Sequence, residues 1–127
     1  MAVVNLVGPP NLSKIGEQVM MIDQPKREEY FKVFIDAIGG TVEEKSELYY
    51  TSSPINYVTS NSSPTLMLYG EKDLIVPWQQ PAELDAKLTA CGVEHTYRLY
   101  TGQEHNMRDV KEEVNEEIVT FLNTYLK

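Results

Sequence analysis

Residues 63–77 read SPTLMLYGEKDLIVP, and this stretch decides the fold. Its apolar middle, residues 65–69, has the length and the unbroken apolar character of a strand buried on both faces of a parallel sheet. The polar turn GEKD ends the strand, and residues 77–91 then have the apolar spacing of a helix that ends at Gly92. A buried strand followed at once by a helix is typical of the β-α-β units of α/β proteins.

Two further segments supply the remaining strands. Residues 2–7 (AVVNLV) form an apolar run that stops at a Gly-Pro-Pro sequence, which again indicates a buried parallel strand. In residues 94–100, Tyr97 and Leu99 alternate with Thr96 and Arg98, and this alternation favours the edge of a sheet. The sequence therefore predicts an α/β fold, a small parallel sheet of about three strands flanked by helices.

The rest of the chain reads mostly as helix. Residues 11–47 are polar and helical, and the pair Gly39-Gly40 ends one helix there. Thr41 and Glu44 have the spacing of a capping box, which predicts that another short helix opens at this point. Residues 51–64 are rich in Ser, Thr, Asn and Pro and read as a loop, whereas residues 108–126 predict an amphipathic terminal helix.

Composition excludes several classes of function. Eleven Lys and Arg against nineteen Asp and Glu give a net charge of −8, which argues against a nucleic-acid partner. No apolar run approaches the ~18 residues that a membrane span needs, so we expect no membrane partner. The single cysteine, Cys91, and two histidines ten residues apart offer too few ligands for a metal, and no cofactor is expected.

The ionisable residues that follow the second and third strands are the candidates for chemistry. Asp73 lies four residues beyond Tyr69, and His105 lies five residues beyond Tyr100. Because parallel strands end at the same edge of a sheet, we expect the two side chains to meet at hydrogen-bond distance and the pKa of His105 to be raised. The alternatives are a turn-forming Asp73 and a solvated His105, and His95 inside the edge strand reads as a structural or surface residue.

Several motifs occur in an order that resembles a known family. SPINYV (residues 53–58) precedes the middle strand, and GEKDLIVP (residues 70–77) follows it as G-x-x-D-x-x-V-P. A helix ending in Gly-Val, a strand and GQEH (residues 102–105) come next. This order resembles the C-terminal half of α/β-hydrolases of the esterase/lipase, prolyl-oligopeptidase-like branch. The likeness covers residues 48–127 well and residues 2–10 more loosely.

The resemblance implies roles for particular residues. It makes Asp73 the acid and His105 the base of a catalytic triad, and it makes Trp78 a candidate wall of the substrate cleft, although packing of Trp78 in the core is the favoured alternative. Residues 1–127 would form one partial domain, with residues 11–47 as a helical lid-like insertion and residues 48–127 as the core.

The family's nucleophile, a Ser in a G-x-S-x-G turn, has no counterpart among these residues, because none of the seven glycines brackets a serine at that spacing. The resemblance implies that this turn precedes residue 1. Ser13 and Cys91 are poor replacements, since neither has the strand–turn–helix setting or a neighbouring histidine in the pattern. We therefore expect the C-terminal portion of a serine ester hydrolase, inactive alone; a serine peptidase is less favoured.

Two other readings stay open. The chain could be a non-catalytic binding or assembly module derived from that fold. A flavodoxin-like domain would need about five strands and a phosphate-binding loop, to which Gly8-Pro9-Pro10 is poorly suited.

The expected partners follow from the same features. A small ester substrate would bind only if an N-terminal half completed the site. Residues 2–7 carry no charge and no proline that would block strand pairing at a free edge. We therefore expect a homodimer through residues 2–7.

Overall fold

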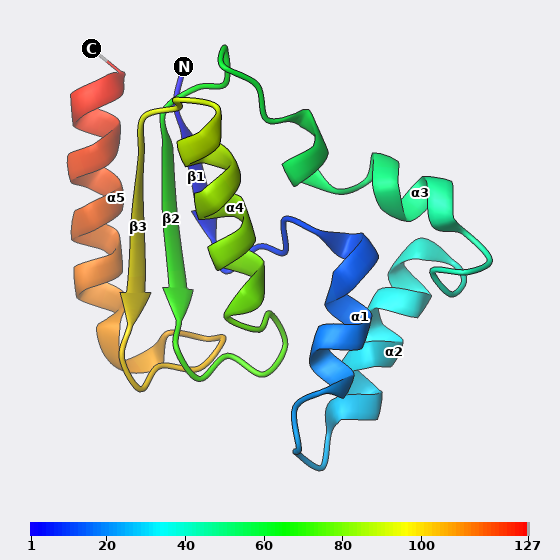
Figure 1. Cartoon of the computed structure of the whole chain (residues 1–127). Helices are drawn as coiled ribbons and strands as arrows, with labels where there is room; N and C mark the ends of the chain where they lie inside the picture. The colour runs from blue at the N-terminus through cyan, green and yellow to red at the C-terminus, as the bar shows by residue number, and fades with distance from the viewer. Residues whose placement is uncertain (127) are drawn as a thin grey trace.

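The structure, a computed structural model, describes residues 1–126 and contains one parallel sheet (Figure 1). The sheet has three strands, β1 (Val3–Leu6), β2 (Thr65–Gly70) and β3 (His95–Tyr100), in the order β1-β2-β3. Both pairings are parallel, and β2 lies in the centre. The predicted fold class, a small α/β sheet of three strands flanked by helices, is confirmed.

Helices cover both faces of this sheet and extend beyond it. In chain order they are α1 (Leu12–Met20), α2 (Arg27–Ile38), α3 (Ser46–Thr51), α4 (Gln79–Ala90) and α5 (Lys111–Tyr125). Two short 3-10 helices occupy Pro54–Tyr57 and Arg108–Val110. Figure 1 shows α4 and α5 against the sheet, with α1, α2 and α3 grouped to the side of α4.

The central strand supplies the middle of both cores. Met67 and Tyr69 belong to a cluster on the α4 face, which also takes in Ile15 and Val19 of α1. Leu66 and Leu68 belong to a second cluster on the α5 face, with side chains of α5. Successive side chains of a strand point to opposite faces, and all six residues of β2 are buried. An apolar run without alternation is therefore what a strand covered by helices on both sides requires.

A buried polar network fixes α1 to α4. Gln80 is fully buried; its amide nitrogen donates to Asn11 O at 2.9 Å and to Gln18 Oε1 at 2.6 Å, and its Oε1 accepts from Asn11 N at 2.9 Å. Glu83 accepts from the side chains of both Asn11 and Gln18. Because every polar group of the Gln80 side chain has a partner, the network holds in one place the start of residues 11–47, hereafter the helical segment.

Residues 53–58 (SPINYV), which precede β2, also form hydrogen bonds with the start of the helical segment. Ser53, fully buried, accepts a hydrogen bond from Leu12 N at 2.8 Å and donates one to Tyr49 O at 2.7 Å. Ile55 N donates to Pro10 O at 3.0 Å. The residues after β1 and the residues before β2 are thus joined directly.

Two local expectations need correction. The capping box between Thr41 and Glu44 forms both of its hydrogen bonds, but it closes a turn, and α3 begins at Ser46 because Lys45 (φ −128°) is not helical. The segment 51–64 is not wholly loop, since it contains the 3-10 helix Pro54–Tyr57.

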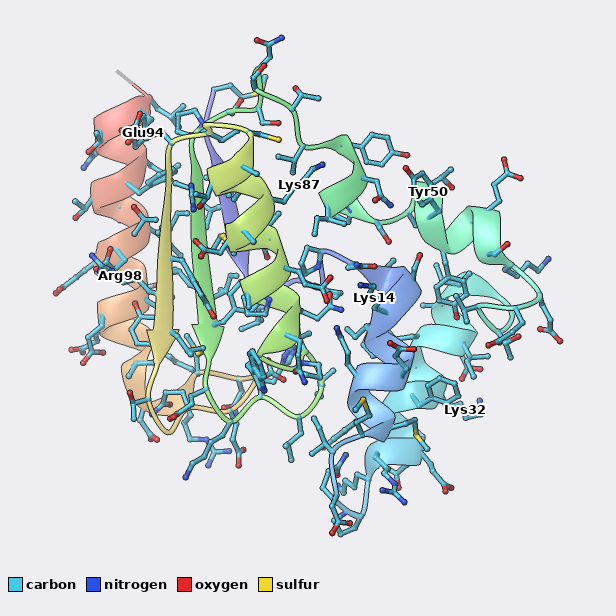
Figure 2. All side chains as sticks on the ribbon, viewed as in Figure 1. Lys14, Lys32, Tyr50, Lys87, Glu94 and Arg98 are labelled. Atoms are coloured by element: carbon cyan, nitrogen blue, oxygen red, sulfur yellow. The ribbon has the colours of Figure 1, made fainter. Side chains whose placement is uncertain are left out.

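Charged side chains line the outer surface. Arg98 of β3 reaches Glu117 of α5 at 3.3 Å, and Lys14 and Lys32 lie exposed on the helical segment (Figure 2). Within residues 1–126, no helix has the length and apolar character to cross a membrane.

Candidate active site

The loops that follow β2 and β3 approach each other closely at the carboxyl edge of the sheet. Glu71 N donates to Tyr100 O at 3.0 Å, and Lys72 N donates to Gln103 O at 2.8 Å. Gly70 lies at the point of contact: a Cβ at this position would come within 2.4 Å of the backbone oxygen of Gln103. Only glycine allows this approach, so Gly70 sets the spacing between the two loops.

Asp73 makes two different kinds of contact with its two carboxylate oxygens. Its Oδ1 accepts hydrogen bonds from the backbone N–H groups of Ile75 and Val76, each at 2.8 Å, as in an Asx turn. Its Oδ2 contacts His105 Nδ1 at 2.7 Å, and its side chain is fully buried. Asp73 is therefore both the turn-forming residue and the partner of the histidine, which were alternatives in the sequence.

The contact with Asp73 determines the state of His105. Since a carboxylate accepts, Nδ1 carries the proton, and the neutral ring presents an unprotonated Nε2. The hydrogen bond that His105 Nδ1 donates to Asp73 raises the pKa of His105, partial burial opposes this, and the negative charge of Asp73 adds to the rise. Asp73 and His105 thus lie at the predicted hydrogen-bond distance, and the pKa of His105 is shifted in the predicted direction.

His105 lies between two cavities. One, of about 210 Å³, is on the side of β1 and α5 and includes Leu6, Val7 and Met107. The other, of about 290 Å³, is on the side of α2 and includes Tyr30 and Lys72. With 38% of its side chain exposed, the imidazole is accessible to a reactant from either side.

Two strained residues at the first cavity were not foreseen. Val7 (φ +51°) and Met107 (φ +52°) are the two non-glycine residues in the left-handed region among residues 1–126, and both line this cavity. Val7 N is held by Leu68 O at 2.9 Å. Strain of this kind clusters at functional sites, but propensity gives no sign of it, because Val and Met seldom adopt this conformation.

The other sequence candidates lie elsewhere. Trp78 is 58% exposed, so the favoured prediction that it packs in the core is wrong. Cys91 ends α4, and its thiol lies against Val58 O at the amino end of the sheet, the opposite end from His105. Ser13 is on α1, and within residues 1–126 no hydrogen bond joins it to His105.

The second histidine has a structural setting. His95 Nδ1 lies 2.7 Å from Val93 O, and its Nε2 lies 2.9 Å from Asp85 Oδ1. Both ring nitrogens are thus occupied, and the side chain is only 13% exposed. The part of the chain that the structure describes holds no group of three or more His, Cys, Asp or Glu side chains placed to hold a metal.

Comparison with known protein families finds a match over most of the chain. The BD-FAE family matches residues 1–88, a range that includes Asp73 and also the helical segment, where the sequence motifs had suggested little likeness. No curated protein matches the chain.

Three solved structures have the same fold. A truncated carbohydrate esterase from gut microbiota superimposes with a TM-score of 0.73 at 18% identity, over 99% of this chain and 43% of that one. A puromycin-hydrolyzing peptidase of Mycobacterium tuberculosis gives 0.72 at 20% identity, over 98% of this chain and 18% of that one. A Pyrococcus furiosus esterase gives 0.58 at 20% identity, over 99% and 46%. The chain spans less than half the length of each, and the fold is that of α/β-hydrolases.

Proposed function

The chain belongs to the BD-FAE family, and from that membership we propose that it supplies the acid and the base of a serine ester hydrolase. Asp73 is the acid, His105 is the base, and a serine nucleophile comes from residues outside this sequence. Residues 11–47 form the lid-like insertion of that enzyme, and residues 48–127 form the C-terminal part of its core. The 2.7 Å contact between Asp73 Oδ2 and His105 Nδ1 is the observation that carries the proposal.

The geometry supports a defined sequence of proton transfers. His105 Nε2 accepts the proton of the serine hydroxyl as the serine oxygen attacks the ester carbonyl carbon. The imidazolium, stabilised by Asp73, then donates this proton to the departing alcohol oxygen, which leaves an acyl-serine. In the second half, Nε2 takes a proton from water, the hydroxide attacks the acyl carbon, and the serine recovers its proton.

The two cavities beside His105 suggest how the parts are arranged. The cavity toward β1 lies at the free edge of the sheet, where a further strand carrying the nucleophile has room to pair. The cavity toward Tyr30 and Lys72 lies under the helical segment and is the substrate side in this proposal. An ester substrate is favoured over a peptide because the family and two of the three structures compared are described as esterases.

A chimera tests this function. The chain replaces the part of the gut carbohydrate esterase that it superimposes on, and cleavage of p-nitrophenyl acetate is measured. We expect activity that falls by roughly a thousandfold or more in His105→Asn and in Asp73→Asn, as removal of a triad member does. His95→Asn is the matched control, since His95 also contacts an aspartate but lies at the other end of the sheet.

The test also addresses the rival function, a non-catalytic binding or assembly module. That reading is favoured by one observation, the lack of a G-x-S-x-G sequence within the 127 residues. A folded chimera without activity, or one whose activity survives His105→Asn, would favour the module and end the catalytic proposal.

A further inference from the structure

We propose that Tyr30, on helix α2 of the helical segment, determines which esters the site accepts by donating a hydrogen bond from its hydroxyl to the alcohol part of the substrate. The substrate class is an ester whose alcohol carries an oxygen acceptor, a hydroxyl or an ether, near the ester group. This inference rests on the proposed function and adds to it a residue that is distant in sequence from Asp73 and His105.

The cavity under the helical segment brings Tyr30 and His105 to one site. Both residues line this space of about 290 Å³, Tyr30 from α2 and His105 from the loop after β3. The rest of the lining consists of two apolar and three exposed polar side chains, Leu74, Ile75, Lys72, Glu104 and Asn106. Apolar walls with a small number of polar groups are typical of sites that bind small molecules.

The proposed proton transfers decide which part of the substrate enters this cavity. His105 Nε2 donates a proton to the departing alcohol oxygen, so that oxygen must lie within about 2.6–3.2 Å of Nε2. In the proposed function, the cavity on the side of β1 receives the strand that carries the nucleophile, and the acyl group stays bonded to that nucleophile. The alcohol part of the ester therefore extends from His105 into the cavity toward Tyr30.

Tyr30 is held in place, whereas the charged side chains of this cavity are not. Tyr30 and Ile75 are half-buried and pack against the core cluster on the α4 face. Ile75 N also donates to Asp73 Oδ1 at 2.8 Å, which connects this wall of the cavity to the proposed acid. Lys72 and Glu104 are exposed, and neither forms an ion pair among residues 1–126. A fixed donor favours binding because less conformational entropy is lost when the substrate arrives.

A close contact between α1 and α2 fixes the helix that carries Tyr30. A Cβ on Gly16 of α1 would lie 2.6 Å from the ring of Phe31, the residue after Tyr30, so any other residue at position 16 would force the ring to move. The buried side chain of Gln80 fixes α1 in turn to α4. Figure 1 shows this order of elements, with α4 on the sheet and α1 and α2 side by side. The position of Tyr30 is therefore set by contacts that begin at the sheet.

The hydroxyl of Tyr30 is open to a ligand. The hydroxyls of Tyr49, Tyr57 and Tyr69 each donate to a backbone oxygen, whereas no group among residues 1–126 accepts a hydrogen bond from the hydroxyl of Tyr30. A phenolic hydroxyl donates readily to an ether or hydroxyl oxygen. A site that bonds an oxygen of its substrate in this way disfavours an analogue that lacks the oxygen.

Two acetate esters of the same shape test the role of Tyr30 in the chimera described above. Methoxyethyl acetate has an ether oxygen where butyl acetate has a methylene group, and both esters give the same acetyl-serine. A difference in kcat/KM between them therefore arises before the alcohol leaves. Release of acetic acid is followed by titration at constant pH.

Tyr30→Phe should lower kcat/KM for methoxyethyl acetate about fivefold more than for butyl acetate, which is the effect of one neutral hydrogen bond. Tyr50→Phe is the matched control. Tyr50 is an exposed tyrosine on α3 (Figure 2), and it does not line the cavity. The ratio of the two kcat/KM values should stay at its wild-type value in this control.

The possible results distinguish this inference from the proposed function. An active chimera in which Tyr30→Phe keeps the wild-type ratio overturns the role of Tyr30 and leaves the proposed function standing. An equal change of the ratio in Tyr50→Phe overturns it as well, because the effect would not come from the cavity. A chimera without activity, or one whose activity survives His105→Asn, ends the proposed function and this inference with it.

Discussion

Replacing Gly70 with Ala should separate Asp73 from His105. A Cβ at position 70 would lie 2.4 Å from Gln103 O, whereas ordinary contacts begin at 3.4 Å, so the loop after β3 must retreat by about 1 Å. Passed on in full to His105, this displacement would lengthen the 2.7 Å contact between Oδ2 and Nδ1 to about 3.7 Å, too long for a hydrogen bond. Overpacking of this kind costs about 1–3 kcal/mol of folding free energy.

The pKa of His105 distinguishes this effect from a general loss of stability. The hydrogen bond to Asp73 is the main cause of the raised pKa, so the pKa of His105 should fall in Gly70→Ala. The assay follows the imidazole Cε1–H resonance against pH by NMR, together with denaturant unfolding.

Gly92→Ala serves as the control for this measurement. A Cβ on Gly92 (φ +68°) would meet no neighbouring atom within 4 Å, so the substitution costs only the left-handed conformation, about 1–2 kcal/mol. It should leave the titration of His105 unchanged. If Gly70→Ala destabilises the fold but leaves that titration where it was, the contact does not depend on the spacing set by Gly70, and the reasoning is wrong.

Three other predictions concern the same chain. The folded state binds a proton on His105 more tightly than the unfolded state does, because the pKa of His105 is raised on folding. The difference in free energy of unfolding between wild type and His105→Gln should therefore be largest below pH 6.5, the ordinary pKa of His, and should decline as pH rises through the raised pKa. A difference that grows with pH would contradict this assignment. Gln80→Met should cost roughly 2–3 kcal/mol in chemical denaturation because it strands the backbone of Asn11 and the amide of Gln18, whereas Gln79→Met, which removes an amide oxygen that has no partner, should be close to neutral. The chain alone should cleave p-nitrophenyl acetate no faster than free imidazole; purified activity that disappears in Ser13→Ala or Cys91→Ala would show that a substitute nucleophile exists.

The arrangement of the sheet was predictable because its strands carry strong and different patterns. The unbroken apolar run of residues 65–69 requires cover on both faces, and the alternation in residues 94–100 allows exposure on one side. Two parallel neighbours that end at one edge then bring the loops of Asp73 and His105 together, and Gly70 sets their spacing. The contact between them is therefore a consequence of topology, and topology follows from hydrophobic pattern.

Other features depend on tertiary contacts that no local pattern encodes. Trp78 has an apolar ring and precedes a buried helix, but the start of α4 leaves it at the surface. Val7 adopts a conformation disfavoured for a β-branched residue because Leu68 holds its amide. The side chain of Gln80 bonds to Asn11, which lies 69 positions earlier, and to Gln18, which lies 62 positions earlier. Partners so far apart leave no periodic signal in the sequence.

The two histidines, ten positions apart in the sequence, give the molecule a built-in reference for chemical labelling. His95, at the amino end of β3, has both ring nitrogens engaged, whereas Asp73 engages only one nitrogen of His105. A reagent that acylates neutral imidazole should therefore modify one histidine and spare the other within the same polypeptide. At a fixed reagent dose, the labelled fraction of the His105 peptide, with the spared His95 peptide as the internal reference, would report on access to the carboxyl edge of the sheet.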